Sequence, residues 1–141
     1  MEECPPGCVF VVDSRGDPKA ASAGGILLTR LMARGVAGAV TDGGFRDTPD
    51  LAVMPWPTYH AAPSAPTNLI RHHAVDTNLP IGCGEVPVYP GDIMVGDGEG
   101  WSVSLPTWPM RWRPRVSSRR WSRISCRNGW RRATASAAST R

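Results

Sequence analysis

A glycine-rich turn near the middle of the chain is followed at once by two adjacent charges of opposite sign. The turn is Thr41-Asp42-Gly43-Gly44, and the charged pair is Arg46 and Asp47. In α/β folds, loops of this kind at the ends of buried strands commonly carry the chemistry. A carboxylate there suits a hard cation such as Mg²⁺ or Mn²⁺, and a guanidinium beside it stabilises developing negative charge. The pattern also fits a surface turn with an exposed ion pair, which contributes little energy.

Three elements are expected to position this loop. Apolar runs at Cys8–Asp13 and Val36–Val40 predict strands, and the span from about Ser22 to Arg34 predicts a helix. A strand, a helix and a strand in so short a span predict a βαβ unit with parallel pairing. We expect Ser22 to cap the helix and Gly35 to end it. The predicted inward stripe of the helix is Ile26, Leu27, Leu28 and Leu31.

Prolines and turn residues divide the chain after this loop. Thr48 is expected to cap a short helix with Pro49 in its first position. Strands are predicted at 58–61 and 69–75, and Pro80 is expected to bar regular pairing in 78–84. Residues 86–89 turn at Pro90-Gly91-Asp92 into 93–95, which predicts a β-hairpin or a sharp corner. Composition and pattern together indicate a mixed α/β domain.

Four ordered motifs resemble the class II pyruvate aldolases, which include 4-hydroxy-4-methyl-2-oxoglutarate aldolases and the regulator of ribonuclease E activity A. The motifs are Gly24-Gly25-Ile26-Leu27-Leu28, Arg34-Gly35-Val36-Ala37-Gly38, Asp42-Gly43-Gly44-Phe45-Arg46-Asp47, and Val88-Tyr89-Pro90-Gly91-Asp92-Ile93 with Gly96-Asp97-Gly98-Glu99-Gly100. Their order and spacing are kept over roughly 5–100. The resemblance implies an RraA-like swivelling β/β/α core, here incomplete at both ends. It also implies a homotrimer or hexamer when the domain is intact.

The same resemblance implies a metal-dependent lyase for pyruvyl substrates. Such an enzyme cleaves 4-hydroxy-4-methyl-2-oxoglutarate, decarboxylates oxaloacetate, or both. By this resemblance Asp47 holds Mg²⁺ or Mn²⁺, and Arg46 is the catalytic residue that grips the 2-oxo acid. The backbone N–H groups of Gly25, Ile26 and Leu27 bind the substrate carboxylate. That last role also has a physical basis, because the first N–H groups of a helix are unpaired and its dipole favours anions.

Two departures from the family pattern affect the expected activity. The position that carries an acidic residue in the characterised aldolases, where it positions a proton-relaying water, is Gly25 here. A second acidic residue comes from the C-terminal part of a neighbouring subunit, which in this chain is rich in arginine. We expect metal and pyruvyl binding to survive these losses and aldol proton transfer to fail, which would leave the protein inactive as an aldolase as written. The alternative function is a non-catalytic, protein-binding regulator of the ribonuclease-regulator type.

Charge divides the chain into 1–100 and 101–141. The first part carries twelve acidic and six basic side chains, and the second carries ten arginines and five of the six tryptophans with no acidic residue. We expect a partial RraA-like domain over 1–100 and a tail over 101–141 that is disordered or read out of frame. A weaker alternative is nucleic-acid binding by this tail, with arginine on phosphates and tryptophan on bases.

The remaining polar residues are expected to be structural. Asp42 is expected to cap its turn, and His60, which follows an aromatic residue at a strand end, to be structural and not catalytic. Cys4 and Cys8 have half the spacing of a zinc site, but no second pair of ligands follows, so reduced thiols are expected. No apolar run approaches the roughly 18–20 residues that span a bilayer. The expectation is therefore a soluble, cytoplasmic protein without a membrane partner.

Overall fold

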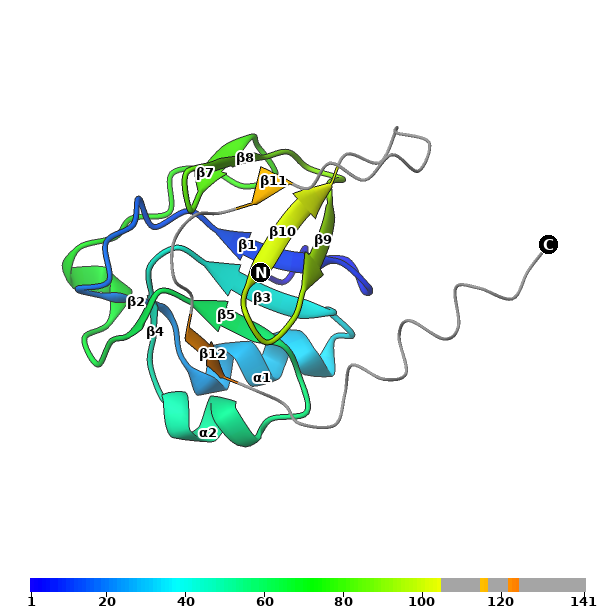
Figure 1. Ribbon diagram of the computed structural model, residues 1–141. Helices are drawn as coiled ribbons and strands as arrows, with labels where there is room; N and C mark the ends of the chain where they lie inside the picture. The colour runs from blue at the N-terminus through cyan, green and yellow to red at the C-terminus, as the bar shows by residue number, and fades with distance from the viewer. Residues whose placement is uncertain (105–114, 117–121, 125–141) are drawn as a thin grey trace.

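The computed structural model describes residues 1–104, 115–116 and 122–124 (Figure 1). Two α-helices and a 3₁₀ turn accompany short strands arranged in four sheets. The elements are β1 (Val9–Val12), β2 (Ala21–Ala23), α1 (Gly25–Ala33), β3 (Gly38–Thr41), β4 (Gly44–Phe45), α2 (Thr48–Val53), β5 (Thr58–His60), β6 (Ala62–Pro63), η1 (Asn68–Ile70), β7 (Ile81–Cys83), β8 (Val86–Val88), β9 (Ile93–Gly96), β10 (Trp101–Ser104), β11 (Arg115–Val116) and β12 (Ser122–Ile124).

The central sheet has the order β1-β3-β5-β12. Strands β1 and β3 pair in parallel from Val9 with Gly38 to Val12 with Thr41, and β3 pairs in parallel with β5. The predicted βαβ unit is therefore confirmed. Its crossover also contains β2, which leaves the central sheet and pairs with β4 in the parallel sheet β2-β4-β6. Mixed parallel and antiparallel pairing confirms the expected α/β class.

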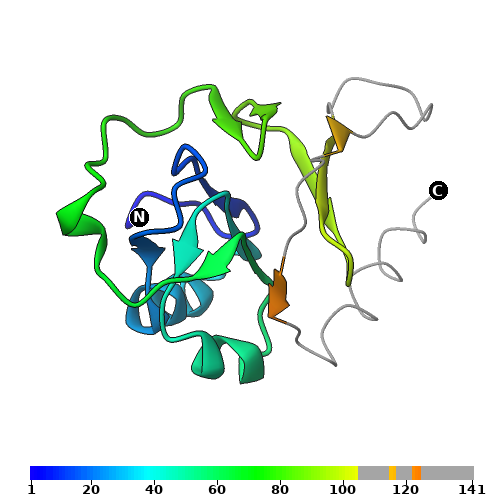
Figure 2. The same ribbon diagram turned by 60° about the vertical axis from the view of Figure 1, so that its left-hand side comes forward.

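Two apolar clusters lie on opposite faces of the central sheet. Ala39 packs with the helices in one cluster, and its neighbour Val40 packs with β7–β10 in the other, because successive side chains of a strand point to opposite faces. Figure 2 shows the helices on one side of the sheet and the β9–β10 ribbon on the other. The fully buried side chains Leu28, Leu31 and Leu51 belong to the helix side.

Helix α1 begins three residues later than the sequence pattern predicts. Ser22 lies in β2 instead of capping the helix, and Gly24 occupies the N-cap without a side-chain bond. Leu28 and Leu31 face the core as expected, whereas Ile26 is 86% exposed and Leu27 is 37% exposed, so half of the predicted stripe is wrong. Both lie in the first turn of the helix. Gly35 has a φ of +82° and ends the helix as predicted.

Several predictions in the second half of the domain are wrong. Residues 69–75 form no strand, and only the short η1 turn stands at their start. Ile81–Cys83 does pair, with β8, although Pro80 precedes it. Pro80 lies outside the strand and so takes no position in the ladder. The connecting residues Gly84 and Glu85 have φ values of +62° and +66°, which suits the tight turn of a two-residue hairpin.

The Pro90-Gly91-Asp92 segment makes a corner and not a hairpin. Strand β8 pairs with β7, and β9 pairs with β10. Asp92 shapes the corner, because its carboxylate accepts the N–H of Tyr89 at 2.9 Å. Residues 101–104 form strand β10, with Trp101 and Val103 buried, so the expectation of no strand after Gly100 is wrong there. Most of the predicted disordered tail lies outside the described residues.

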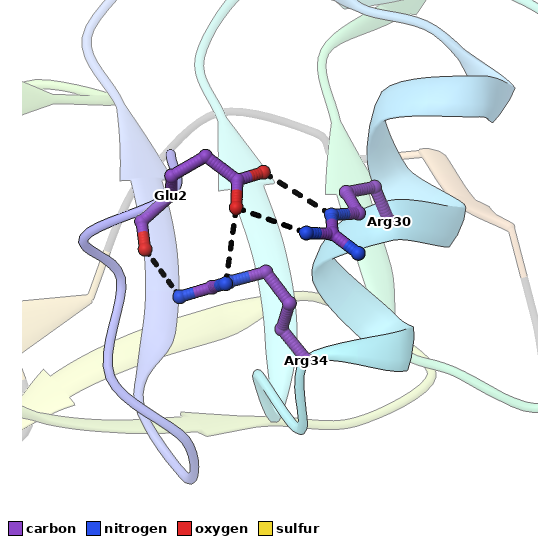
Figure 3. A network of polar contacts seen from close by, with 3 residues as sticks. All are labelled: Glu2, Arg30 and Arg34. Carbon is purple, nitrogen blue, oxygen red and sulfur yellow. Dashed lines mark hydrogen bonds and ion pairs between the residues drawn. The ribbon is translucent and has the colours of Figure 1, made fainter.

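Glu2 ties the N-terminal segment to the end of α1 (Figure 3). Its carboxylate pairs with Arg30 at 3.1 Å and with Arg34 at 3.0 Å, and Arg34 also donates to the backbone oxygen of Glu2. Cys4 and Cys8 are free thiols with their Sγ atoms 3.1 Å apart. Within the described part of the chain, no three His, Cys, Asp or Glu side chains form a metal cluster. None of the described helices is long and apolar enough to cross a membrane.

Candidate functional site

The turn after β3 is fixed by a buried carboxylate. Asp42 is 3% exposed and accepts backbone N–H groups from Ser14 at 2.6 Å, Gly16 at 2.9 Å and Gly84 at 3.4 Å. These donors come from the loop after β1 and from the β7–β8 turn. The turn itself is closed by Thr41, whose Oγ1 accepts the N–H of Gly43 at 3.1 Å. Asp42 therefore joins three loops. The prediction that it caps its own turn is wrong.

Gly43 and Gly44 are required by close packing and not by their backbone angles, since neither has a positive φ. A Cβ at Gly43 would lie 2.5 Å from Cβ of Ser14, and one at Gly44 would lie 2.6 Å from Cβ of Ser64. Real Cβ atoms do not approach so closely. The two glycines thus let the loop after β1 and the segment after β6 pack directly against the turn.

Arg46 and Asp47 follow β4 and meet the start of α1. The N–H of Arg46 donates to the oxygen of Ala23 at 3.1 Å. Asp47 occupies the N-cap position of α2 in the left-handed conformation with φ +60° and makes no side-chain cap bond there; its Oδ2 instead accepts the N–H of Gly25 at 2.8 Å. The predicted cap, Thr48, is the first helical residue instead, and the N-cap position belongs to Asp47.

The two charged side chains also contact each other. Arg46 Nε lies 3.6 Å from Asp47 Oδ2, and the side chains are 38% and 43% exposed. At that exposure the ion pair contributes little to stability. A Cβ at Gly24 would collide with Nε of Arg46 and lie 2.9 Å from Asp47 Oδ2. The absence of a side chain at Gly24 therefore leaves room for the Arg46 guanidinium and the Asp47 carboxylate beside the start of α1.

A hollow of about 350 Å³ opens beside this pair. It is lined by Ala21, Ser22, Ala23, Gly24, Ile26, Leu27, Arg46, Thr67, Asn68 and Leu69. The structure thus brings Arg46, Ile26 and Leu27 to one pocket. Gly25 and Asp47 are bonded to each other beside the pocket and do not line it. Sequence reasoning missed Gly24 and the wall from η1, because the pairing that closes the pocket joins segments distant in the chain.

Ser22 belongs to a cluster of hydroxyl groups beneath the pocket. Its Oγ is hydrogen-bonded to Oγ of Ser14 and lies 3.2 Å from Oγ1 of Thr41, which is 3.0 Å from Ser14 Oγ. Ser14 and Thr41 are buried. The hydrogen bonds within the cluster satisfy hydroxyl groups that would otherwise be costly to bury. They also hold Ser22, which lines the pocket, in place.

The carboxylate of Asp47 fits a weakly held divalent cation. Its Oδ2 is bonded to Gly25, while Oδ1 has no hydrogen-bond partner within the described residues. Mg²⁺ usually keeps several waters and takes only one or two carboxylates from a protein. The Oδ1 of the half-exposed Asp47 side chain could therefore serve as a ligand of Mg²⁺ or Mn²⁺, with water molecules as the remaining ligands.

Two further candidates lie away from the pocket. His60 is 1% exposed and packs on Phe45 at a centroid distance of 5.9 Å, as expected of a structural residue. Burial lowers the pKa of His60 below its ordinary value. Arg71 pairs with Asp17 at 2.9 Å and is therefore engaged outside the pocket.

Comparison with known proteins supports the resemblance seen in the sequence. The model of the RraA-like family (Aldolase/RraA) matches residues 1–103. A Halalkalibacterium halodurans protein named "Putative 4-hydroxy-4-methyl-2-oxoglutarate aldolase" is 37% identical over 103 residues, which are 73% of this chain and 49% of the relative. The chain spans about half the length of the curated relatives it matches.

Solved structures of RraA proteins share the fold. The RNA-processing inhibitor RraA from Thermus thermophilus is 29% identical with a TM-score of 0.63, and the match covers 78% of this chain and 67% of that one. RraAS2 of Streptomyces coelicolor, described as an unusual member of the RNase ES inhibitor RraA family, is 29% identical with a TM-score of 0.60 over 73% and 52%. The predicted RraA-like fold is therefore confirmed.

Proposed function

The chain belongs to the RraA-like family, and from that premise we propose that it is a divalent-metal-dependent lyase for pyruvyl substrates. The proposed reaction is oxaloacetate decarboxylation, cleavage of 4-hydroxy-4-methyl-2-oxoglutarate, or both, and the site favours the first. The proposal includes a homotrimer or hexamer as the assembly. The observation that carries it is that Arg46 and the start of α1 line one pocket, with Asp47 beside it and bonded to the N–H of Gly25.

Each group has a defined part in this proposal. Arg46 binds the 2-oxo acid through its carboxylate or keto oxygen, since a guanidinium presents paired donors to such groups. The N–H groups of Ile26 and Leu27 face the substrate carboxylate, while Asp47 occupies the N–H of Gly25. A Mg²⁺ ion on Asp47 would supply positive charge that stabilises an enolate.

Decarboxylation requires fewer catalytic groups than aldol cleavage. Among the described residues that line the pocket there is no Asp, Glu or His. Aldol cleavage needs a base to take the proton of the substrate hydroxyl, and none is placed for it. In decarboxylation the carbon–carbon bond breaks, CO₂ leaves, and the electron pair forms the enolate of pyruvate, which then takes a proton from water.

Removal of the metal and of its proposed ligand tests this function. We expect Mg²⁺-dependent oxaloacetate decarboxylation that EDTA abolishes and that Asp47→Ala lowers by about 100-fold, the scale typical of a lost electrostatic group. Asp50→Ala is the matched control, because Asp50 is an exposed carboxylate three residues away in α2. Turnover that survives both EDTA and Asp47→Ala would refute the proposal.

A carboxylate introduced at position 25 tests whether aldol cleavage and decarboxylation need different groups. A Cβ at Gly25 has its nearest contacts at 3.4 Å, to Cβ and Oδ2 of Asp47, so a Cβ is accommodated there at ordinary contact distance. We expect Gly25→Glu to raise aldol cleavage while leaving decarboxylation within about twofold, because only cleavage lacks a base.

The second candidate function is a protein-binding regulator. It is favoured by the RNA-processing inhibitor among the structural relatives and by the missing acid at Gly25. A folded protein that binds Mg²⁺ but turns over neither substrate, with Gly25→Glu equally inactive, would support the regulator over the lyase.

A further inference from the structure

Two thiols near the start of the chain lie in contact. Cys4 and Cys8 are free, and their Sγ atoms are 3.1 Å apart. Nonbonded carbon atoms usually stay about 3.5–4.0 Å apart, so these two larger sulfur atoms are closely packed. A disulfide needs a sulfur separation of about 2.0 Å. A movement of about 1 Å therefore brings the two sulfur atoms to bonding distance.

A tight turn brings the two cysteines together. Pro5-Pro6-Gly7 separates them, with Pro6 in the second position of the turn and Gly7 in the third at φ +81°. The N–H of Cys8 closes the turn by donating to the oxygen of Pro5 at 3.4 Å. Proline followed by a glycine with positive φ is the residue pattern of a type II turn. The chain therefore reverses between the two thiols and places them side by side.

Backbone bonds hold this turn against the end of α1. The N–H of Gly7 donates to the oxygen of Gly35 at 2.7 Å, and the N–H of Ala37 donates to the oxygen of Cys8 at 2.7 Å. On the other side of the turn, Glu2 is bound to the two arginines at the end of α1 (Figure 3). Both sides of the turn are thus anchored to the same part of the molecule. The fold itself keeps the two thiols together.

The two thiols differ in their surroundings. Sγ of Cys8 donates to the oxygen of Pro5 at 2.9 Å in an exposed bond, so its lone pairs are left to accept the S–H of Cys4. Burial, and next the hydrogen bond with Cys8, raise the pKa of the Cys4 thiol to about 11. Cys8 is thus the thiol that a small oxidant reaches first. Cys4, whose proton lies toward Cys8, is placed to attack Cys8 afterwards.

We propose that Cys4 and Cys8 form a reversible thiol–disulfide site that is oxidised by low-molecular-weight disulfides such as oxidised glutathione. Cys8 loses its proton to water, attacks one sulfur of the oxidant and forms a mixed disulfide, and the first small thiolate leaves. Cys4 then loses its proton, attacks Sγ of Cys8 and displaces the second small thiolate. Both released thiolates take up a proton. Two protein thiols are oxidised, and the small disulfide is reduced to two thiols.

The new bond ties the segment that carries Glu2 to the start of β1. In the reduced protein the ion pairs of Glu2 hold this segment, and exposed ion pairs are weak tethers. A covalent link restricts the opening of the turn much more. We expect oxidation to slow hydrogen exchange at the N–H groups of Gly7 and Ala37 by at least about fivefold, because both bonds break when the turn opens.

Peptide mapping of the full chain, equilibrated with oxidised and reduced glutathione, tests the site. Trypsin releases residues 1–15 as one peptide, since Arg15 is the first basic residue. After the remaining thiols are alkylated, an internal disulfide leaves this peptide unalkylated and lighter by two hydrogens. We expect the internal disulfide to exceed the mixed disulfide at least about tenfold in the folded protein, because the second thiol is already in place. Dithiothreitol should reverse it.

The unfolded chain and a third cysteine serve as matched controls. In concentrated urea the ratio of internal to mixed disulfide should fall about tenfold, since the turn no longer holds the thiols together. Cys83 is buried in the other apolar cluster, with its Sγ 3.7 Å from the oxygen of Val12, and should stay a thiol in the folded protein. Cys4→Ser should stop the reaction at the mixed disulfide on Cys8.

The outcomes test the site independently of the proposed lyase function. A predominant internal disulfide that depends on the fold supports the proposal, whether or not oxaloacetate is turned over. A peptide 1–15 that stays a dithiol, or that carries only glutathione, overturns it. An equal ratio of internal to mixed disulfide in the folded and unfolded chain also overturns it, because the turn would then contribute nothing.

Discussion

Two segments that each contribute to the pocket are built in opposite ways. In the segment 42–47, Asp42 and Phe45 are buried and the two glycines pack against neighbouring loops without room for a Cβ. In the segment 67–79, Leu69 is 86%, Ile70 64%, Val75 91% and Leu79 52% exposed. The first segment holds charged groups in a fixed place. The second can change its exposed side chains with little effect on the fold.

The largest expected effect is loss of the carboxylate that joins the loops. Asp42→Ala leaves three backbone N–H groups without their acceptor, and two of these bonds, from Ser14 and Gly84, are buried. We expect a loss of about 3 kcal/mol in the free energy of unfolding, measured by urea denaturation. Asp76→Ala, in the exposed segment, should cost less than about 0.5 kcal/mol. Equal losses would show that the two segments do not differ in the way described.

An intermediate effect is expected where Gly24 makes room for the charged pair. Gly24 has an extended backbone with φ −129°, so alanine is allowed there, but its Cβ would displace the flexible Arg46 side chain. We expect Gly24→Ala to weaken oxalate binding about tenfold, through loss of an oriented charged contact, while changing the stability little. Gly25→Ala is the control, because its Cβ meets only ordinary contacts at 3.4 Å. Equal affinities in the two variants would exclude a positioning role for Gly24.

The smallest expected effect is on the pH dependence of stability, and it comes from the buried His60. Burial lowers the pKa of His60, so the folded protein holds it neutral, whereas the unfolded chain takes up a proton below about pH 6.5. The free energy of unfolding should therefore fall as the pH drops through the unfolded pKa and level off below the folded pKa. His60→Phe should flatten this slope in thermal melts between pH 7.5 and 5. An unchanged slope would assign the dependence to other groups.

Local signals predicted the elements next to the charged pair. Apolar runs closed by glycine and turn residues gave β1, β3 and the end of α1 at Gly35, because these features depend on neighbours in the sequence. They placed Arg46 and Asp47 after the glycine-rich turn that follows β3, but they did not predict β4 (Gly44–Phe45), the buried strand that directly precedes the pair. The pairing of Asp47 with Gly25 was not predictable, since it depends on how two elements 22 residues apart dock.

The sequence-based predictions were wrong for apolar residues that are exposed and not packed in the core. Ile26 was assigned to the buried stripe, and 69–75 to a strand, because apolar residues usually pack inside. In the structure these side chains stand at the pocket mouth or on the surface. The wall residue Thr67 gave no signal at all, because only its bridge to Ala21, 46 positions earlier, brings it to the pocket.

The most direct test of the account is the binding of Mn²⁺ together with oxalate, a planar mimic of the pyruvate enolate, followed by water-proton relaxation. We predict a ternary complex in the wild type and in Asp50→Ala, weakened at least about tenfold in Asp47→Ala, because a cation held by few protein ligands depends on each of them. Equal Mn²⁺ and oxalate binding by Asp47→Ala and the wild type would contradict a metal-assisted site at Arg46 and Asp47.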